Sequence, residues 1–114
     1  MKKENVLWVM LITIILFFFM VDLHETIHER INEYFNVRSE RRFSFQNFVG
    51  VYPNEYDLSR LNGYEFTNLM TLHSLNEVMS YYTFPFLIIV VLLLLIYFKL
   101  SEVSEYYEKQ TRSK

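Results

Sequence analysis

Two long apolar stretches dominate the chain, one near each end. Residues 6–21 (VLWVMLITIILFFFMV) and residues 84–98 (FPFLIIVVLLLLIYF) contain no charged side chain. As a helix the first stretch covers only ~24 Å, whereas a bilayer core of ~30 Å needs about 20 residues. We therefore expect the first helix to continue past Asp22 and the second to cover about 81–100. The pattern predicts a mostly α-helical integral membrane protein with two transmembrane helices.

A cleaved signal peptide is the competing interpretation of the first stretch, because Lys2 and Lys3 precede it. The stretch ends in bulky side chains followed by Asp22, without the small residues of a cleavage site. This ending favours an uncleaved span.

The segment between the spans has a changing pattern. Residues 23–36 favour a helix that continues from the first span, and alternation within 41–52 predicts a short β-strand or hairpin. Residues 53–73 contain turn signals. Ser74 opens a stretch with capping-box spacing, which predicts that a helix begins there and leads into the second span. Pro85 fits the first turn of that helix, or a kink if the helix begins upstream.

These patterns divide the chain into four parts. We expect an N-terminal transmembrane helix at 1–23, a connecting segment at 24–83, a second transmembrane helix at 84–100, and a charged C-terminal tail at 101–114 that is solvated or continues the helix for a short distance.

Composition removes several classes of function. The chain has 114 residues, a net charge of −2 and no cysteine. A nucleic-acid partner is not expected, because a binding face for phosphates is basic. Disulfides and thiolate metal sites are excluded, so any metal would be held by His, Asp or Glu. A small excess of Lys and Arg beyond the two outer ends of the spans predicts cytoplasmic termini.

The segment His24-Glu25-Thr26-Ile27-His28 has the form H-E-x-x-H. On a helix, residues i and i+4 lie ~40° apart around the axis and ~6 Å apart along it, so two imidazoles at this spacing can bind one zinc ion. Glu25 lies ~100° round from His24, where a carboxylate can take a proton from metal-bound water. In the competing interpretation the histidines are structural and bond to water, lipid headgroups or Asp22.

The helical projection places the two histidines beside an apolar stripe. The stripe consists of Leu23, Ile27, Ile31, Tyr34 and Phe35. Histidines on a core-facing stripe at a membrane boundary are costly unless they are paired or bind a metal.

A zinc site that keeps one position for water needs a third protein ligand. Glu77 is the first candidate and His73 the alternative, because antiparallel packing of the spans brings this stretch to the level of His24 and His28. Glu77 also has a competing role as the capping partner within 74–77. Lower in rank are three acids: Asp22, Asp57 and Glu65.

A helix that carries H-E-x-x-H, emerges from a membrane span and precedes a short amphipathic strand at 41–52 resembles the intramembrane zinc metalloproteases of the site-2 protease type. The resemblance implies zinc held by His24 and His28, Glu25 as the general base, and hydrolysis of peptide bonds at a membrane. It covers only this helix and strand.

The chain departs from that family's pattern in one respect that concerns the metal. The family has a further span with a Leu-Asp-Gly motif whose aspartate is a ligand. The most similar segment of this chain is Leu61-Asn62-Gly63, which has asparagine in place of the aspartate and so lacks the carboxylate. Our hypothesis is that 73–77 provides the third ligand instead.

Two classes of function follow. The first is a membrane-embedded, zinc-dependent metallopeptidase that hydrolyses membrane-proximal peptide bonds, with the substrate added as a strand along the edge at 43–51. The second is a non-enzymatic two-span membrane subunit or accessory protein with structural histidines. Both have the lipid bilayer as a partner, and both are compatible with a homo-oligomer or a larger membrane partner, because two helices bury few groups.

Overall fold

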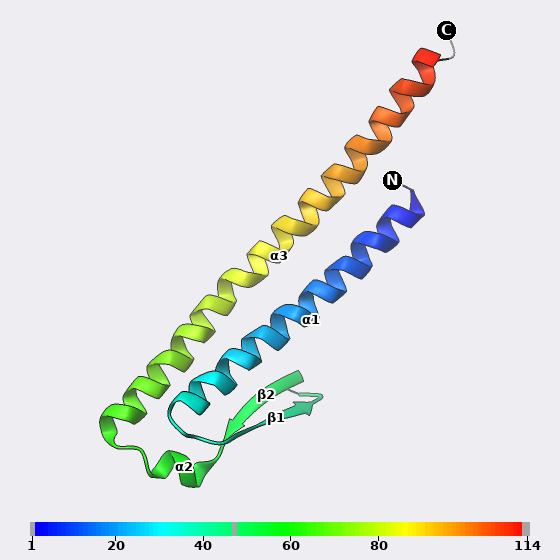
Figure 1. Cartoon of the computed structure of the whole chain (residues 1–114). Helices are drawn as coiled ribbons and strands as arrows, with labels where there is room; N and C mark the ends of the chain where they lie inside the picture. Colours follow the sequence, from blue (N-terminus) through cyan, green and yellow to red (C-terminus); the bar gives the residue numbers. More distant parts are fainter. Residues whose placement is uncertain (1, 47, 113–114) are drawn as a thin grey trace. The chain divides into compact units, whose positions relative to one another are not determined.

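The computed structural model describes residues 2–46 and 48–112. Along the chain it contains α1 (Lys3–Tyr34), β1 (Ser39–Ser44), β2 (Phe48–Pro53), α2 (Glu55–Ser59) and α3 (Gly63–Arg112), as Figure 1 shows. The protein is mostly helical, and an antiparallel hairpin lies between its two long helices in the sequence. The predicted parts at 1–23, 41–52 and 101–114 include residues 1, 47 and 113–114, which lie outside the described residues.

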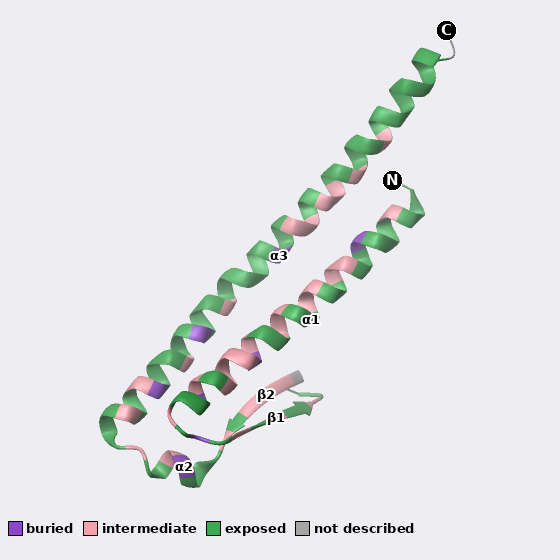
Figure 2. Cartoon of the chain, in the orientation of Figure 1, coloured by how far each residue is buried: buried purple, intermediate pink, exposed green. Residues whose placement is uncertain are grey.

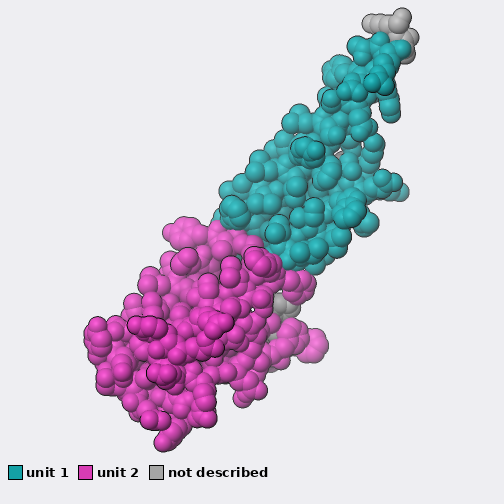
Figure 3. Space-filling view, viewed as in Figure 1, with its two compact units in different colours: residues 1–17, 84–114 teal, residues 18–83 magenta. Residues whose placement is uncertain are grey.

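The chain forms two compact units, coloured separately in Figure 3. The central unit is residues 18–83, and the terminal unit comprises 1–17 and 84–114. H-E-x-x-H, the hairpin and both candidates for the third ligand belong to the central unit.

Both long helices are long and apolar enough to cross a bilayer, and 6% of the most apolar window of each is buried. Figure 2 shows that few residues of either helix are buried. The core helix of a soluble protein would bury such a surface, so both helices could be membrane spans.

Within the terminal unit, the start of α1 lies beside the later part of α3. The Lys2 ammonium contacts the Glu105 carboxylate at 2.9 Å, and the rings of Phe17 and Phe84 lie 6.2 Å apart. Since low residue numbers pair with high ones, the two segments run antiparallel.

The end of α1 is set by Asn36, which adopts a left-handed conformation with φ 55°. The amide of Asn36 donates to the Glu33 carbonyl at 3.0 Å, and the amide of Val37 donates to the Asn32 carbonyl at 2.9 Å. These two bonds form a Schellman cap, which satisfies carbonyls that a helix end leaves unpaired. Asparagine tolerates this conformation better than most residues.

The predicted start of the second long helix at Ser74 is wrong, because α3 begins eleven residues earlier, at Gly63. Asn62 and Glu65 form the capping box: the Asn62 side chain accepts from the Glu65 amide at 2.9 Å, and the Glu65 carboxylate accepts from the Asn62 amide at 3.0 Å. The Ser74 hydroxyl instead donates to the Met70 carbonyl within the helix. Glu77 therefore lies inside α3 and does not cap the start of the helix.

Pro85 lies inside α3 and not in its first turn, because the helix begins upstream. At the other end, α3 continues to Arg112, so the segment after residue 100 prolongs the helix as far as it is described. The turn-rich region at 53–73 also contains α2, whose N-cap Asn54 accepts from the Asp57 amide at 3.1 Å.

The hairpin predicted at 41–52 is present, with strands that pair from Ser39 opposite Pro53 to Ser44 opposite Phe48. An ion pair between Arg38, which precedes β1, and Asp57 connects the hairpin to α2. Arg38 donates through Nε and Nη2 to the two carboxylate oxygens of Asp57, at 2.7 and 3.1 Å. These bonds lower the pKa of Asp57 below its usual range.

The interior of the central unit is unusually polar. Its buried residues, as far as the structure describes them, are Glu25, Asn32, Asp57 and Asn76 together with Val37 and Leu69. Polar groups are costly to bury unless they find partners. The contact between α1 and α3 is therefore specified by particular polar interactions.

Candidate metal centre

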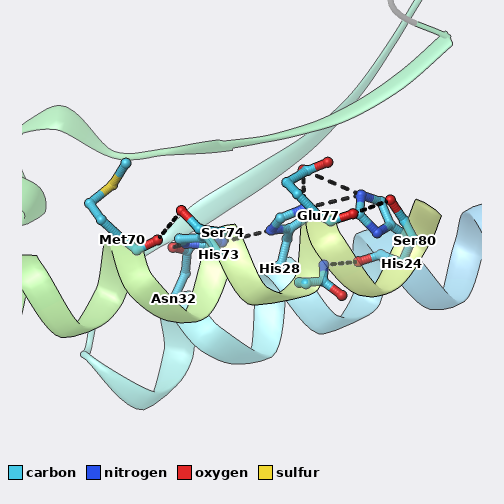
Figure 4. Close-up of polar contacts among 9 residues, drawn as sticks. His24, His28, Asn32, Met70, His73, Ser74, Glu77 and Ser80 are labelled. Carbon is cyan, nitrogen blue, oxygen red and sulfur yellow. Dashed lines mark hydrogen bonds and ion pairs between the residues drawn. The ribbon is translucent and has the colours of Figure 1, made fainter. Parts of the chain in front are cut away.

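Three donor atoms converge between α1 and α3. His24 Nε2 and His28 Nε2 lie 3.2 Å apart, and Glu77 Oε1 lies 3.0 Å from His28 Nε2 and 3.5 Å from His24 Nε2. Figure 4 shows both rings turned toward the Glu77 carboxylate. The histidines come from successive turns of α1 and the carboxylate comes from α3. The three residues form a group that could hold a metal ion.

The size of this triangle fits zinc. Zinc binds imidazole nitrogen and carboxylate oxygen at ~2.0–2.2 Å in tetrahedral geometry, which puts neighbouring donor atoms ~3.3–3.6 Å apart. The observed separations of 3.0, 3.2 and 3.5 Å lie close to that value. An ion ~2 Å from all three atoms would lie within about 1 Å of their plane and keep a fourth position free.

The chemistry of the donors points the same way. A neutral imidazole has one nitrogen with a lone pair, and an ionised carboxylate only accepts. Lone pairs and a carboxylate at these distances repel each other unless a proton or a cation lies between them. Exposure differs across the group: the side chains of His28, His24 and Glu77 are 12%, 21% and 55% exposed. The carboxylate side of the triangle is therefore open to water.

Glu25, the predicted general base, is buried at 8% exposure. On the helix it lies ~100° from His24 and ~60° from His28, next to the face that meets α3. Among the described residues, no hydrogen bond or ion pair to the Glu25 carboxylate is present. A buried carboxylate without a protein partner is available to bond water or substrate.

His73, the alternative third ligand, is placed differently from Glu77. Its Nδ1 lies 2.6 Å from Nδ1 of His28, the ring nitrogen that faces away from the triangle. Its Nε2 lies 2.9 Å from Oδ1 of Asn32. His73 therefore extends the site behind His28 and does not join the three converging donors.

Burial lowers the pKa of His73 below the ordinary value for histidine, the adjacent His28 lowers it further, and Glu77 opposes the change. A neutral imidazole is thus favoured at this position near pH 7. A neutral ring accepts one hydrogen bond and donates another, which matches its two polar neighbours.

Two contacts fix the helix and hairpin around the site. The buried Asn76 donates to the backbone carbonyl of His24 at 3.1 Å, and so sets the register of α3 against α1 next to Glu77. Arg41 of β1 donates to Glu29 at 3.0 Å and to Thr26 at 2.9 Å on the other side of α1.

The three acids ranked lower as ligands lie elsewhere. Asp22 pairs with Arg41, Asp57 pairs with Arg38, and Glu65 caps α3. Each of these carboxylates has a structural partner, and none belongs to the converging group.

Only part of the predicted apolar stripe on α1 is shielded from solvent, because Ile27, Ile31 and Phe35 are half-buried. Leu23 and Tyr34 are 48% and 78% exposed, whereas Asn32 is 1% exposed. Sequence reasoning missed Asn32, Asn76 and Arg41. A repeat of four residues was the available signal for the first of these: His24, His28 and Asn32 follow one another at this spacing, as do His73 and Glu77.

No protein-family model matches the chain, and neither the curated proteins nor the solved structures compared with it give a match.

Proposed function

We propose that the chain is a membrane-embedded, zinc-dependent metallopeptidase that hydrolyses membrane-proximal peptide bonds. The observation that carries the proposal is the convergence of His24 Nε2, His28 Nε2 and Glu77 Oε1 within 3.5 Å of one another. Three protein ligands and an open fourth position are typical of catalytic zinc, whereas structural zinc sites are closed by four protein ligands.

The ligand set and its surroundings suit hydrolysis. Bound zinc would polarise the scissile carbonyl and lower the pKa of a bound water toward 7. Glu25 would accept the proton of that water and pass it to the leaving amine. Its place in H-E-x-x-H, its burial and the absence of a described protein partner leave its carboxylate available for this role.

The membrane part of the proposal rests on the two apolar helices. Val21, the last residue of the first apolar stretch, precedes His24 by three residues, and Glu77 precedes the second stretch by seven. At ~1.5 Å per residue these are short distances along each helix, so the metal centre would lie at the boundary of the bilayer. Substrates would be peptide segments close to the membrane.

The hairpin offers a means of holding such a segment. β1 and β2 form a two-stranded sheet in the described part of the chain, so each strand has an outer edge without a described strand partner. An extended peptide can pair with an edge of this kind through its main chain. The edge at 43–51 and the resemblance to site-2 proteases support this mode of binding, and both stay predictions, as does the cytoplasmic location of the termini.

Glu25→Gln tests the proposal most sharply, because the change keeps the size of the side chain and removes the base. We expect zinc to be retained within a few-fold, and hydrolysis of a membrane-anchored peptide to fall by about 10²–10⁴. Glu33→Gln is the matched control, since Glu33 lies on the same helix, is exposed and pairs only with Arg30 among the described residues. Zinc retention with unchanged hydrolysis in Glu25→Gln would overturn the catalytic role.

The alternative, a non-enzymatic two-span subunit or accessory protein with structural histidines, makes the opposite prediction. Purified protein would contain no zinc, and removing His28 would change stability alone. Metal analysis of wild type and His28→Ala therefore separates the two functions.

A further inference from the structure

A line of polar contacts continues from the metal centre into the interior. The Nε2 atom of His28 is one of the three converging donors, and the Nδ1 atom of the same ring lies 2.6 Å from Nδ1 of His73. His73 Nε2 lies 2.9 Å from Oδ1 of Asn32. The rings of His28 and His73 are stacked, with centroids 4.9 Å apart. Figure 4 shows the three side chains in this order.

The end of the line determines where its protons lie. An amide oxygen only accepts, so with Oδ1 of Asn32 toward His73 the Nε2 of His73 must carry a proton. The neutral ring then has a lone pair on Nδ1, which accepts the proton of His28 Nδ1–H. His28 in turn has its lone pair on Nε2, the atom that faces His24 and Glu77. With the amide reversed, every donor would reverse, and the proton would lie on Nε2 of His28.

Asn32 is costly to keep at this position. It is 1% exposed, and its Nδ2 has no hydrogen-bond partner among the described residues. A buried donor without a partner destabilises a protein, and an apolar side chain would avoid that cost. The amide oxygen of Asn32 bonds His73, which an apolar side chain could not do.

We propose that His73 and Asn32 are positioning residues that hold His28 in the Nδ1–H form, so that its Nε2 is free to bind the metal. This inference rests on the proposed zinc site. Metal-binding histidines commonly donate their second ring N–H to a fixed acceptor, which sets the ring's orientation and tautomer. Here the acceptor is a second histidine, itself oriented by an amide.

Zinc affinity of the full chain in detergent, measured by competition with a chelator, tests the proposal. His73→Phe keeps a ring and removes the acceptor, and Asn32→Ala removes the far end of the line. We expect each to weaken zinc binding about 10- to 100-fold. His73→Gln carries both an acceptor and a donor and should stay within a few-fold of wild type. Ser74→Ala, which removes only a bond to the Met70 carbonyl, is the matched control.

Nitrogen-15 spectra of the imidazoles provide a second measurement that does not depend on metal. The chain has only three histidines, so each ring can be assigned from single variants. In metal-free Glu77→Ala, where no carboxylate competes for a proton on His28 Nε2, His28 should be protonated on Nδ1 and unprotonated on Nε2, and adding Asn32→Ala should remove this preference. A merely structural role for Asn32 would leave the tautomer unchanged.

The outcomes separate this proposal from the proposed function. Zinc affinity in both His73→Phe and Asn32→Ala equal to wild type overturns the positioning role and leaves the zinc site intact. If His73→Phe does not fold, as judged by circular dichroism, Asn32→Ala and His73→Gln decide. Wild type without zinc contradicts the proposed function, and a His28 ring protonated on Nε2 in metal-free Glu77→Ala overturns the positioning role.

Discussion

Removing the Glu77 carboxylate should weaken zinc binding strongly and leave the metal-free protein as stable as before. Glu77 provides the only donor from α3 and the only carboxylate in the triangle, with Oε1 at 3.0 and 3.5 Å from the two histidine nitrogens. Loss of an outer partner of a metal ligand already costs 10- to 100-fold in affinity. Loss of the ligand itself should cost at least about 100-fold, or ~2.7 kcal/mol.

The metal-free protein should respond differently to the same change. The Glu77 side chain is 55% exposed, and its described contacts are with the two histidine rings. Exposed substitutions of this kind change stability by about 0.5 kcal/mol or less. The thermal transition of metal-free Glu77→Ala should therefore coincide with that of metal-free wild type.

Chelator competition and circular dichroism on the same detergent preparation measure both quantities. Glu77→Gln should fall between wild type and Glu77→Ala, because its amide oxygen is a neutral and weaker ligand. Glu108→Ala, an exposed acid on the same helix, controls for the change in net charge and should have no effect. Equal zinc affinity in Glu77→Ala and wild type would refute the assignment of the third ligand.

Three further predictions concern the central unit around the site. Leu69→Ala should destabilise the metal-free protein by about 2–5 kcal/mol, because Leu69 is 1% exposed; chemical denaturation measures this, and a loss below 1 kcal/mol would contradict its role as core. Asn62→Ala should cost about 1 kcal/mol through loss of the cap on α3, visible as a lower thermal transition, whereas an unchanged transition would contradict the capping role. Because Arg38 lowers the pKa of Asp57, their interaction stabilises the fold above the ordinary carboxyl pKa and is lost as pH falls through the lowered pKa. Asp57→Asn should therefore remove this loss of stability at acid pH, as measured by thermal melts recorded across pH. An unchanged pH profile would contradict the linkage between the Asp57 pKa and stability.

The features that the sequence predicted correctly depend on local pattern. Continuous apolar runs define the two long helices, and alternation around Phe43 and Phe45 defines the hairpin. His24 and His28 fall on one helix face by spacing alone. Each of these inferences needs only neighbouring residues, so it does not depend on how the chain folds back on itself.

The start of α3 shows where local pattern is ambiguous. Residues 62–65 and 74–77 both have an N-cap residue followed three positions later by glutamate. Asn62 and Gly63 are also typical turn residues, so the sequence indicates a turn at this segment and not the start of a helix. Which of the two boxes begins the helix depends on whether residues 63–73 are helical. Packing of the buried Leu69 favours a helix there, and the composition of this segment does not decide the question.

The line of contacts from His28 through His73 to Asn32 could not be predicted, because it depends on the register of α1 against α3. Asn32 meets His73 only if α1 and α3 pack antiparallel with one particular offset, which the buried Asn76 helps to set through the His24 carbonyl. Polar residues on a buried helix face also run against the apolar-stripe rule that placed Leu23 and Tyr34 inside. That rule fails here because specific polar contacts hold the two helices together.

X-ray absorption at the zinc edge of the purified full chain measures the ligands of the proposed zinc site. We expect one zinc per chain, bound by two imidazole nitrogens and a carboxylate oxygen at ~2.0–2.2 Å, with one imidazole fewer in His28→Ala and no carboxylate in Glu77→Ala. Protein without zinc, or a zinc spectrum unchanged in both variants, would contradict the proposed site.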